Sequence, residues 1–494
     1  MKDGHKTPDP DTSQYAGVVS RESIRILLTH AALHKVDVLA ADIRNAYLQA
    51  PTTETHYIIC GPEFGLEHEG KRAMIVRALY GGKLAGRDFW HHLRSCMREL
   101  GYESCLADPD VWYRPAVRED GTPYYEYVLL YTDDCLVISD NADKVLRKEI
   151  GYYFDLKEES IGKPKIYLGG QVRDVEMPNG QQCWAFGSAQ YVKAAVTNVE
   201  EYLSKIGQSL PARAKTPLSA NYRPELDVSD ELGPDEASYY QSLIGILRWM
   251  VELGRVDLNC EVSMMSSHLA LPRKGHLEQL FHMFGYLKKH HNAEMPFDPT
   301  VPEIEEGDFK PQDWSRSIYG DVEEDLPHNM PKPRGQGMRM TVYVDSDHAG
   351  ESLTRRSRTG YLVFLNSAPI YWMSKKQTST ETSTFGAEFM AMKAACEYSR
   401  GLRYKLRMMG IPCEEPTFIY GDNQSVLANV TVPDSQLKKK SNSIAYHFVR
   451  EGCARSEWRT TYVNTHDNPA DLMTKPLPSG EKRTKFIRRL LWWL

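Results

Sequence analysis

The chain has 494 residues, enough for roughly two to four domains, and its 41% hydrophobic and 26% charged residues are ordinary for a globular protein. Its formal net charge of −6 excludes a uniformly basic nucleic-acid binder, so any such surface must be a local patch. The polar N-terminus has no apolar signal core, no apolar run approaches the roughly 18–20 residues that cross a bilayer, and the nine cysteines form no CxxC pair. We therefore expect an intracellular protein with reduced thiols and no membrane partner.

The first part of the chain is predicted to mix helices and strands. Ser20 is the expected N-cap of a helix, because apolar residues recur at helical spacing directly after it. The predicted elements of this part are a helix over 20–34, a strand over 35–43, a helix over 86–100 and a hairpin over 128–140.

The middle of the chain is predicted to be helical, with amphipathic stretches over 239–253 and 274–290. Residues 293–337 break this pattern with acids, prolines and glycines, a composition typical of a linker. Strands and helices then resume. The expected elements are a strand over 338–347, two strands over 360–376 with a turn at Asn366 and Ser367, a helix over about 384–409, a strand and helix over 416–430, and a strand, loop and helix start over 458–475.

Asp133 and Asp134 interrupt an apolar hairpin, "VLLYTDDCLVISD". Two adjacent carboxylates repel each other unless a cation compensates, and hard divalent cations such as Mg²⁺ prefer oxygen ligands. A solvated acidic turn accounts for these two residues about as well. Asp42, at the end of another predicted strand, favours the metal site, because acids that converge from separate elements build two-metal phosphoryl-transfer sites.

Five segments in this order resemble the reverse transcriptase of copia-type LTR retrotransposons. They are "DIRNAYLQAP", "RALYGGKLAGRDFW", "LGYESCLADPDVWY", "LLYTDDCLVISD" and "YLGGQV", and "YYQSLIGILRWM" is similar to the family's segment between polymerase and RNase H. The resemblance implies a right-hand polymerase palm of ferredoxin-like α+β fold, followed by a helical thumb or connection. The family's fingers part would precede the first helix, and its basic nucleotide-gripping residues have no counterpart here.

The resemblance also implies a role for individual residues. Asp42 and Asp133 would hold catalytic Mg²⁺ ions, and Asp134 would assist. Tyr47 falls where an aromatic ring excludes the ribose 2′-hydroxyl, although a buried core aromatic is an equally good interpretation. Lys83 lies in the loop that matches the family's nucleotide-side motif, where Gly82 and Leu84 replace the usual residues.

A second group of acids, Asp345, Glu388, Asp422 and Asp471, comes from four different predicted elements. A helix cap or a solvated acid would explain each one alone. Together with "TGYLVFLNSAPIYWMSKKQ" and "YHFVREG", they resemble the RNase H domain of the same family, an α/β fold. The resemblance implies that the four acids bind two Mg²⁺ ions around the scissile phosphate.

His466 precedes Asp471 in a loop where such folds carry a mobile histidine, but a plain surface histidine is the favoured interpretation. Two interpretations of the basic run Lys438–Lys440 are equally good: its side chains contact backbone phosphates, or they form a solvated face. The residues Gly386, Ser441 and Ser443 differ from those usual in the family, and none of these positions is one of the four acids.

The overall prediction is a multidomain α+β and α/β protein. Its expected parts are a reverse transcriptase palm with truncated fingers over 1–175, a mostly helical thumb or connection over 176–292, an acidic Pro-rich linker over 293–337, an RNase H-like domain over 338–478 and a basic C-terminal tail over 479–494.

The predicted function is Mg²⁺-dependent RNA-directed DNA synthesis together with hydrolysis of the RNA strand of RNA–DNA hybrids. Each active site would hold two ions, with Mn²⁺ as a substitute for Mg²⁺. The expected partners are an RNA template, a DNA primer, RNA–DNA hybrid and deoxynucleotide triphosphates, in a cytoplasmic particle or the nucleus; the sequence predicts no oligomeric state. Two alternatives remain: a truncated remnant with RNase H activity only, and a non-catalytic nucleic-acid-binding protein.

Overall fold

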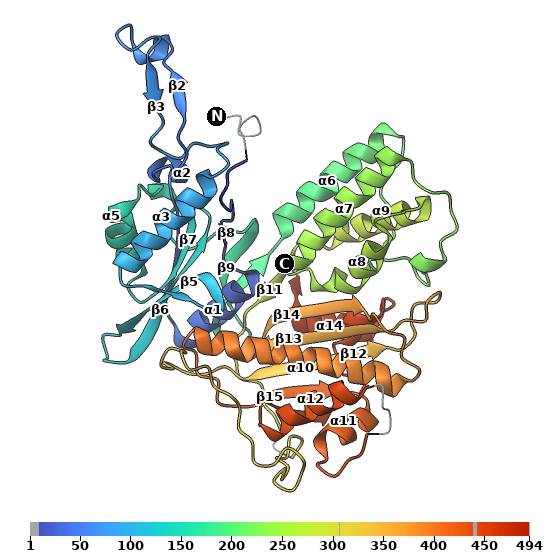
Figure 1. Cartoon of the computed structure of the whole chain (residues 1–494). Helices are drawn as coiled ribbons and strands as arrows, with labels where there is room; N and C mark the ends of the chain where they lie inside the picture. The colour runs from blue at the N-terminus through green and yellow to red at the C-terminus, as the bar shows by residue number, and fades with distance from the viewer. Residues whose placement is uncertain (1–8, 306, 438–441, 494) are drawn as a thin grey trace.

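The computed structural model describes residues 9–305, 307–437 and 442–493, so the predicted basic run Lys438–Lys440 lies outside the described residues. In these residues the chain is mixed α/β, with three five-stranded sheets, one two-stranded sheet and helices packed around them (Figure 1). All nine cysteines carry free thiols. Within the described ranges, no helix combines the length and the apolar character that a membrane crossing requires.

The first sheet has the order β1-β7-β6-β5-β4, and all neighbouring strands are antiparallel. Its strands are β1 (Val38–Asp42), β4 (Glu103–Cys105), β5 (Asp108–Val117), β6 (Pro123–Tyr131) and β7 (Asp134–Ile138). β6 and β7 form the predicted hairpin, in which Tyr131 pairs with Asp134 across a turn made by Thr132 and Asp133. Asp42 lies opposite Asp134 in the pairing of β1 with β7. The register therefore brings the first group of acids to one end of the sheet.

Helices cover both faces of this sheet. They are α1 (Arg21–His34), α2 (Ala46–Gln49), α3 (Ala85–Glu99), α4 (Ala142–Lys144) and α5 (Gly151–Tyr153). Val128 of β6 shares a core with Phe89 of α3, whereas the next residue, Leu129, shares a separate core with Leu27 of α1, because successive side chains of a strand point to opposite faces. The predicted cap of α1 is confirmed, since the Ser20 hydroxyl accepts a backbone N–H of the first turn.

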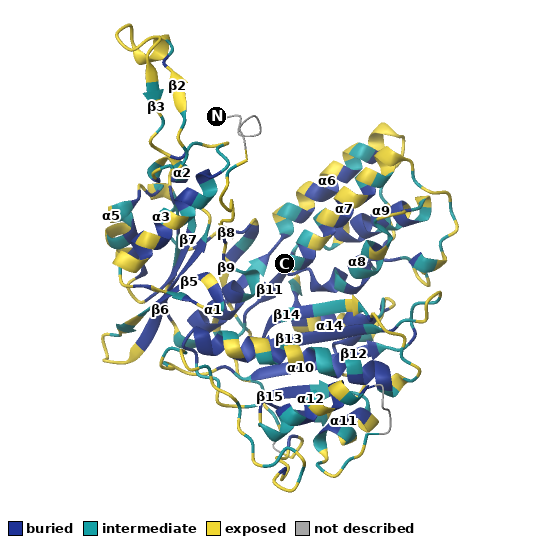
Figure 2. Ribbon diagram, viewed as in Figure 1, coloured by how far each residue is buried: buried dark blue, intermediate teal, exposed yellow. Residues whose placement is uncertain are grey.

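A two-stranded hairpin, β2 (Tyr57–Ile59) and β3 (Arg72–Met74), projects from this part of the molecule (Figure 1). It is largely exposed, as its yellow colour in Figure 2 shows. Short 3-10 segments cover Pro62–Phe64, Glu158–Ser160, Pro224–Leu226, Val256–Leu258 and Ser266–His268, and a π-helical segment covers Val145–Ile150.

The second sheet joins distant parts of the chain in the order β17-β11-β10-β9-β8. Its strands are β8 (Ile166–Tyr167), β9 (Gly170–Glu176), β10 (Gln182–Gly187), β11 (Ala293–Pro296) and β17 (Trp492–Trp493). The predicted helical middle is confirmed by α6 (Ala189–Lys205), α7 (Pro234–Glu252), α8 (Asn259–Met265) and α9 (Lys274–Lys289), which lie together beside this sheet (Figure 1).

The third sheet has the order β14-β13-β12-β15-β16, with β12, β13 and β14 antiparallel and with β15 and β16 parallel to β12. Its strands are β12 (Met340–Asp347), β13 (Arg358–Leu365), β14 (Ala368–Lys376), β15 (Thr417–Gly421) and β16 (Trp458–Tyr462). The accompanying helices are α10 (Thr384–Met408), α11 (Gln424–Thr431), α12 (Ser443–Ala454), α13 (Asp471–Thr474) and α14 (Glu481–Leu490). The predicted turn at Asn366 is present and has a φ of 53°.

The structure corrects the start of the predicted linker. Residues 293–296 form strand β11, which is buried between β10 and β17. Further along the acidic segment, Glu324 forms ion pairs of 2.6 Å with both Arg403 and Arg407 of α10. Burial alone would raise the pKa of Glu324, but hydrogen bonds from these two guanidinium groups lower it to about 2. The composition of this segment is linker-like, yet specific ion pairs fix part of it to the third sheet's helices.

The C-terminal residues are also packed rather than free. Phe486, Ile487 and Leu490 of α14 are buried, and the buried Arg483 donates to the Asp257 carbonyl oxygen at 3.0 Å and pairs with Glu261 at 3.3 Å. Helix α14 therefore joins the third sheet's part of the molecule to the helices of the middle part.

Candidate active site

Three predicted acids meet at one end of the third sheet. Asp345 of β12, Glu388 of α10 and Asp422, directly after β15, each offer a carboxylate oxygen within 4.8 Å of the others. β15 runs parallel beside β12, so the residue that follows β15 lies next to Asp345 near the end of β12. Within the described ranges, no other set of three or more histidine, cysteine, aspartate or glutamate side chains comes together this closely.

Burial and mutual repulsion shift the titration of this acidic triad (Asp345, Glu388 and Asp422). Burial raises the pKa of Glu388 to about 10, and the charges of Asp345 and Asp422 add to this effect. Burial also raises the pKa of Asp345 to about 7, with Asp471 and Asp422 contributing, and it raises the pKa of Asp422. Three carboxyl groups held this close, two of them buried and one half-buried, are suited to a divalent cation, which would favour their ionised forms.

Asp471, the fourth predicted acid, is fully buried at the start of α13, but it faces two ammonium groups. Lys475 Nζ lies 2.6 Å from Asp471 Oδ1 and 3.7 Å from Asp345 Oδ2, and Lys482 pairs with Asp471 Oδ2. Burial opposes the charge of Lys475, but Asp345 and Asp471 raise the pKa of its ammonium group. The structure therefore brings Asp471 close to the triad as an ion-paired carboxylate.

Two neighbours of the triad were missed in the sequence. Asp347 follows Asp345 by two residues on β12, and burial raises its pKa. The alternation of side chains along a strand puts these two acids on the same face, so the pattern could have identified Asp347. Lys475 stands four residues after Asp471, and this spacing brings side chains together in a helical turn.

His466 lies in an exposed turn, and its backbone N–H donates to Asn464 Oδ1 at 2.9 Å. Its neighbour Thr465 forms a hydrogen bond with Asp422 that partly offsets the effect of burial on the pKa of that acid. The loop therefore contacts the triad through Thr465, while His466 itself is on the surface.

The first group of acids is arranged differently. Asp42 and Asp134 face each other on β1 and β7, but in the part of the chain that the structure describes these acids and Asp133 do not form a tight triad. Lys157 Nζ lies 2.7 Å from Asp42 Oδ1, and no local pattern in the sequence predicts this ion pair. Burial, together with the charges of Asp133 and Asp42, raises the pKa of Asp134 to about 6.

The two predicted nucleotide-binding residues lie on separate elements. Tyr47 of α2 is half-buried and stacks on Tyr80 with ring centroids 4.7 Å apart. Burial and the charge of Asp133 raise the pKa of its hydroxyl. Lys83 Nζ lies 2.8 Å from Asp9 Oδ1, so an acid from the first described residues neutralises it in this conformation.

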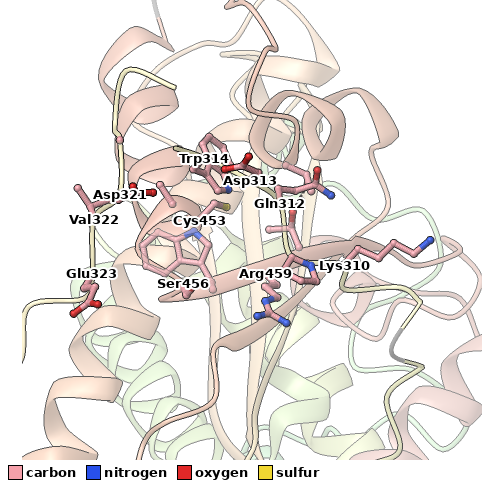
Figure 3. A pocket seen from close by; sticks show the side chains of 16 residues that line it. Lys310, Gln312, Asp313, Trp314, Asp321, Val322, Glu323, Cys453, Ser456 and Arg459 are labelled. Atoms are coloured by element: carbon pink, nitrogen blue, oxygen red, sulfur yellow. Dashed lines mark hydrogen bonds between the residues drawn. The ribbon is translucent and has the colours of Figure 1, made fainter. Parts of the chain in front are cut away.

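A pocket of about 450 Å³ lies elsewhere, between the acidic segment and β16 (Figure 3). Trp314 and Asp313 line it from the acidic segment, and Cys453 and Arg459 line it from α12 and β16. None of the predicted acids lines this pocket.

Comparison with known proteins gives one family match and several similarities to solved structures. Residues 7–200 match the family model described as reverse transcriptase (RNA-dependent DNA polymerase). Among solved structures, an RNase H1 from Halobacterium salinarum is 16% identical, with a TM-score of 0.22 over 28% of this chain and 94% of that chain. LC11-RNase H1 in complex with RNA/DNA hybrid is 11% identical, with a TM-score of 0.23 over 28% of this chain and 94% of that chain.

Curated relatives match nearly the whole chain. The Pol polyprotein from transposon RE1 of Arabidopsis thaliana is 24% identical over 94% of this chain and 28% of the relative, and that from transposon TNT 1-94 of Nicotiana tabacum is 25% identical over 94% and 32%. The chain thus spans about a third or less of these relatives. Its resemblance to the Pol polyproteins of copia-type retrotransposons is confirmed by these matches, and residues 7–200 match the reverse transcriptase family.

Proposed function

We propose that this chain is the reverse transcriptase and RNase H part of a retrotransposon Pol polyprotein. Residues 1–175 would be the polymerase palm, 176–292 the helical thumb or connection, and 338–478 the RNase H-like domain. The observation that carries the proposal is the largely buried triad of Asp345, Glu388 and Asp422, whose ligand oxygens lie within 4.8 Å of one another on three separate elements. The order of three antiparallel strands, a long helix and further strand–helix units around it agrees with the RNase H expectation.

The nuclease site would hydrolyse the RNA strand of an RNA–DNA hybrid. Asp345, Glu388 and Asp422 would hold a divalent cation, with Mg²⁺ as the physiological ion and Mn²⁺ as a substitute. When bound, that ion would lower the pKa of the attacking water and neutralise charge on the scissile phosphate. Thr465 would orient Asp422 through its hydrogen bond, and His466, exposed in the same loop, would be free to reach a product phosphate.

The polymerase site would use Asp42, Asp133 and Asp134 for attack of a primer 3′-hydroxyl on a deoxynucleotide triphosphate. The match of residues 7–200 to the reverse transcriptase family and the register of Asp42 opposite Asp134 support it. Tyr47 would exclude a ribose 2′-hydroxyl. Lys83 would contact the nucleotide after leaving Asp9.

A chain with nuclease activity alone is the second candidate function. The observation that favours it is the ion pair of Lys157 with Asp42, together with the absence of a tight triad among the palm acids of the described residues. Metal binding at the palm would require Lys157 to release Asp42.

Two assays with separate variants test both activities. Hybrid cleavage in Mg²⁺ is expected to disappear in Asp345→Asn/Asp422→Asn and to persist in Asp133→Asn, whereas extension of a primer on an RNA template is expected to show the reverse pattern. The exposed Glu119→Gln serves as a control in both assays. A folded wild-type chain that cleaves no hybrid contradicts the nuclease proposal. Cleavage without primer extension establishes the second candidate.

A further inference from the structure

Asp471 is a buried carboxylate whose two oxygens each form an ion pair with a lysine. Lys475 pairs with Oδ1 and Lys482 with Oδ2. A buried carboxylate without a compensating charge is very unfavourable, and the two lysines supply that compensation for Asp471. The result is that Asp471 stands beside the triad but outside the group whose oxygens converge.

Lys475 does more than neutralise Asp471. Its Nζ also lies 3.7 Å from Asp345 Oδ2, so the ammonium group sits between a triad carboxylate and Asp471. A cation that bridged Asp345 and Asp471 would have to occupy the same space. The side chain of Lys475 is 37% exposed, so a phosphate that enters the site from solvent can reach its ammonium group.

Lys482 is held in place by the rest of its helix. The next residue, Arg483, is buried and anchored to Asp257 and Glu261 of the middle part of the chain. The end of the chain is fixed as well, because β17 pairs with β11. The second ammonium group therefore belongs to a helix that is held by contacts away from the triad.

We propose that the nuclease site of this chain takes one divalent cation through Asp345, Glu388 and Asp422, and that the ammonium group of Lys475 occupies the position beside Asp471 where a second cation would otherwise bind. This inference rests on the proposed nuclease function and refines its metal content. Lys475 is a positioning residue for Asp471 and Asp345, and its positive charge lies where charge on the scissile phosphate would need compensation.

The charges around the site agree with a single ion. Asp345, Asp347, Glu388, Asp422 and Asp471 carry at most five negative charges, and Lys475 and Lys482 supply two positive charges. One divalent cation leaves the group with one negative charge. A second one beside Lys475 would bring the number of cationic centres against the same carboxylates to four and would repel the ammonium group at short range.

The test is a calorimetric titration of the full chain with MnCl₂. The nuclease site's share is obtained by subtracting the ions bound by Asp345→Asn/Asp422→Asn. We expect one Mn²⁺ at this site in the wild-type chain and two in Lys475→Ala. Lys475→Arg, which keeps the charge, should again bind one. Lys485→Ala, which removes a pairing with the exposed Asp467 only, is the matched control and should match the wild type.

Two ions at this site in the wild-type chain, or one ion in a folded Lys475→Ala variant, would overturn the inference. If Lys475→Ala does not fold, Lys475→Gln, which keeps most of the side chain and can still donate to Asp471, takes its place with the same expected count of two. Two ions in the wild type together with intact hybrid cleavage would overturn only this inference. No ion at the site and no cleavage would overturn the proposed nuclease function itself.

Discussion

Removing one carboxylate of the triad is expected to stabilise the metal-free protein. Asp345 is 3% exposed, and burial beside other acids raises its pKa to about 7 from 3.8. A carboxyl group with a raised folded pKa contributes fully to stability below about pH 4, and this contribution is lost as the pH rises through about 7. From these two pKa values the titration of Asp345, relative to its fully protonated form, lowers the unfolding free energy by about 2 kcal/mol at pH 5 and by about 4 kcal/mol at pH 8.

Asp345→Asn avoids this cost because asparagine carries no charge. Its side-chain oxygen can still accept the hydrogen bond that Thr474 donates to Asp345. Thermal melts in EDTA at pH 5 and pH 8 should therefore show a higher melting temperature for the variant, with the larger gain at pH 8. The exposed Asp434→Asn, as a control, should melt with the wild type at both pH values.

Saturating Mg²⁺ should reverse this order at pH 8. A ligand that binds only the folded state raises its stability, and the wild-type chain keeps the full triad whereas the variant does not. A variant that is no more stable than wild type in EDTA, or a gain that is larger at pH 5 than at pH 8, would refute the electrostatic reasoning.

Two further predictions concern packing. Glu324→Gln removes the carboxylate that compensates two buried arginines of α10, and chemical denaturation at pH 7 should show a loss of about 3 kcal/mol of unfolding free energy. This loss should vanish as the pH falls from about 4.5 toward 2. The exposed Asp325→Asn should cost under about 1 kcal/mol, and equal losses in the two variants would contradict the account. Gly452→Ala would place a methyl carbon 1.9 Å from the Trp458 indole and should cost roughly 1–3 kcal/mol of unfolding free energy. The control Gly401→Ala in α10 meets nothing within 4 Å and should be neutral or stabilising. An unchanged melting temperature of Gly452→Ala would show that the contact with Trp458 is not close-packed.

Local patterns in the sequence predicted the elements that local physics determines. Ser20 caps α1, the turn at Asn366 separates β13 from β14, and Asp133 lies in a tight turn between two apolar strands. Each of these features depends on residues only a few positions apart. Capping, alternation and turn propensity were therefore sufficient to predict them.

The features that the sequence left open depend on contacts between distant residues. No local pattern connects Lys482 with Asp471 across a separate helix, or Lys157 with Asp42. The acidic composition around Glu324 predicted a linker, because composition cannot show that two arginines of α10 lie within reach. Even the convergence of the triad required the sheet order, which follows from long-range strand pairing.

The central claim, a metal-dependent nuclease centred on Asp345, Glu388 and Asp422, is tested most directly by one cleavage experiment. A hybrid labelled on either the RNA or the DNA strand is incubated with Mg²⁺ and with wild type, Glu388→Gln or the exposed Asp434→Asn. The account predicts that wild type and Asp434→Asn cut the RNA strand alone and that Glu388→Gln cuts neither strand. Cleavage of the RNA strand by Glu388→Gln at the wild-type rate, or a folded wild-type chain that cuts nothing, would contradict it.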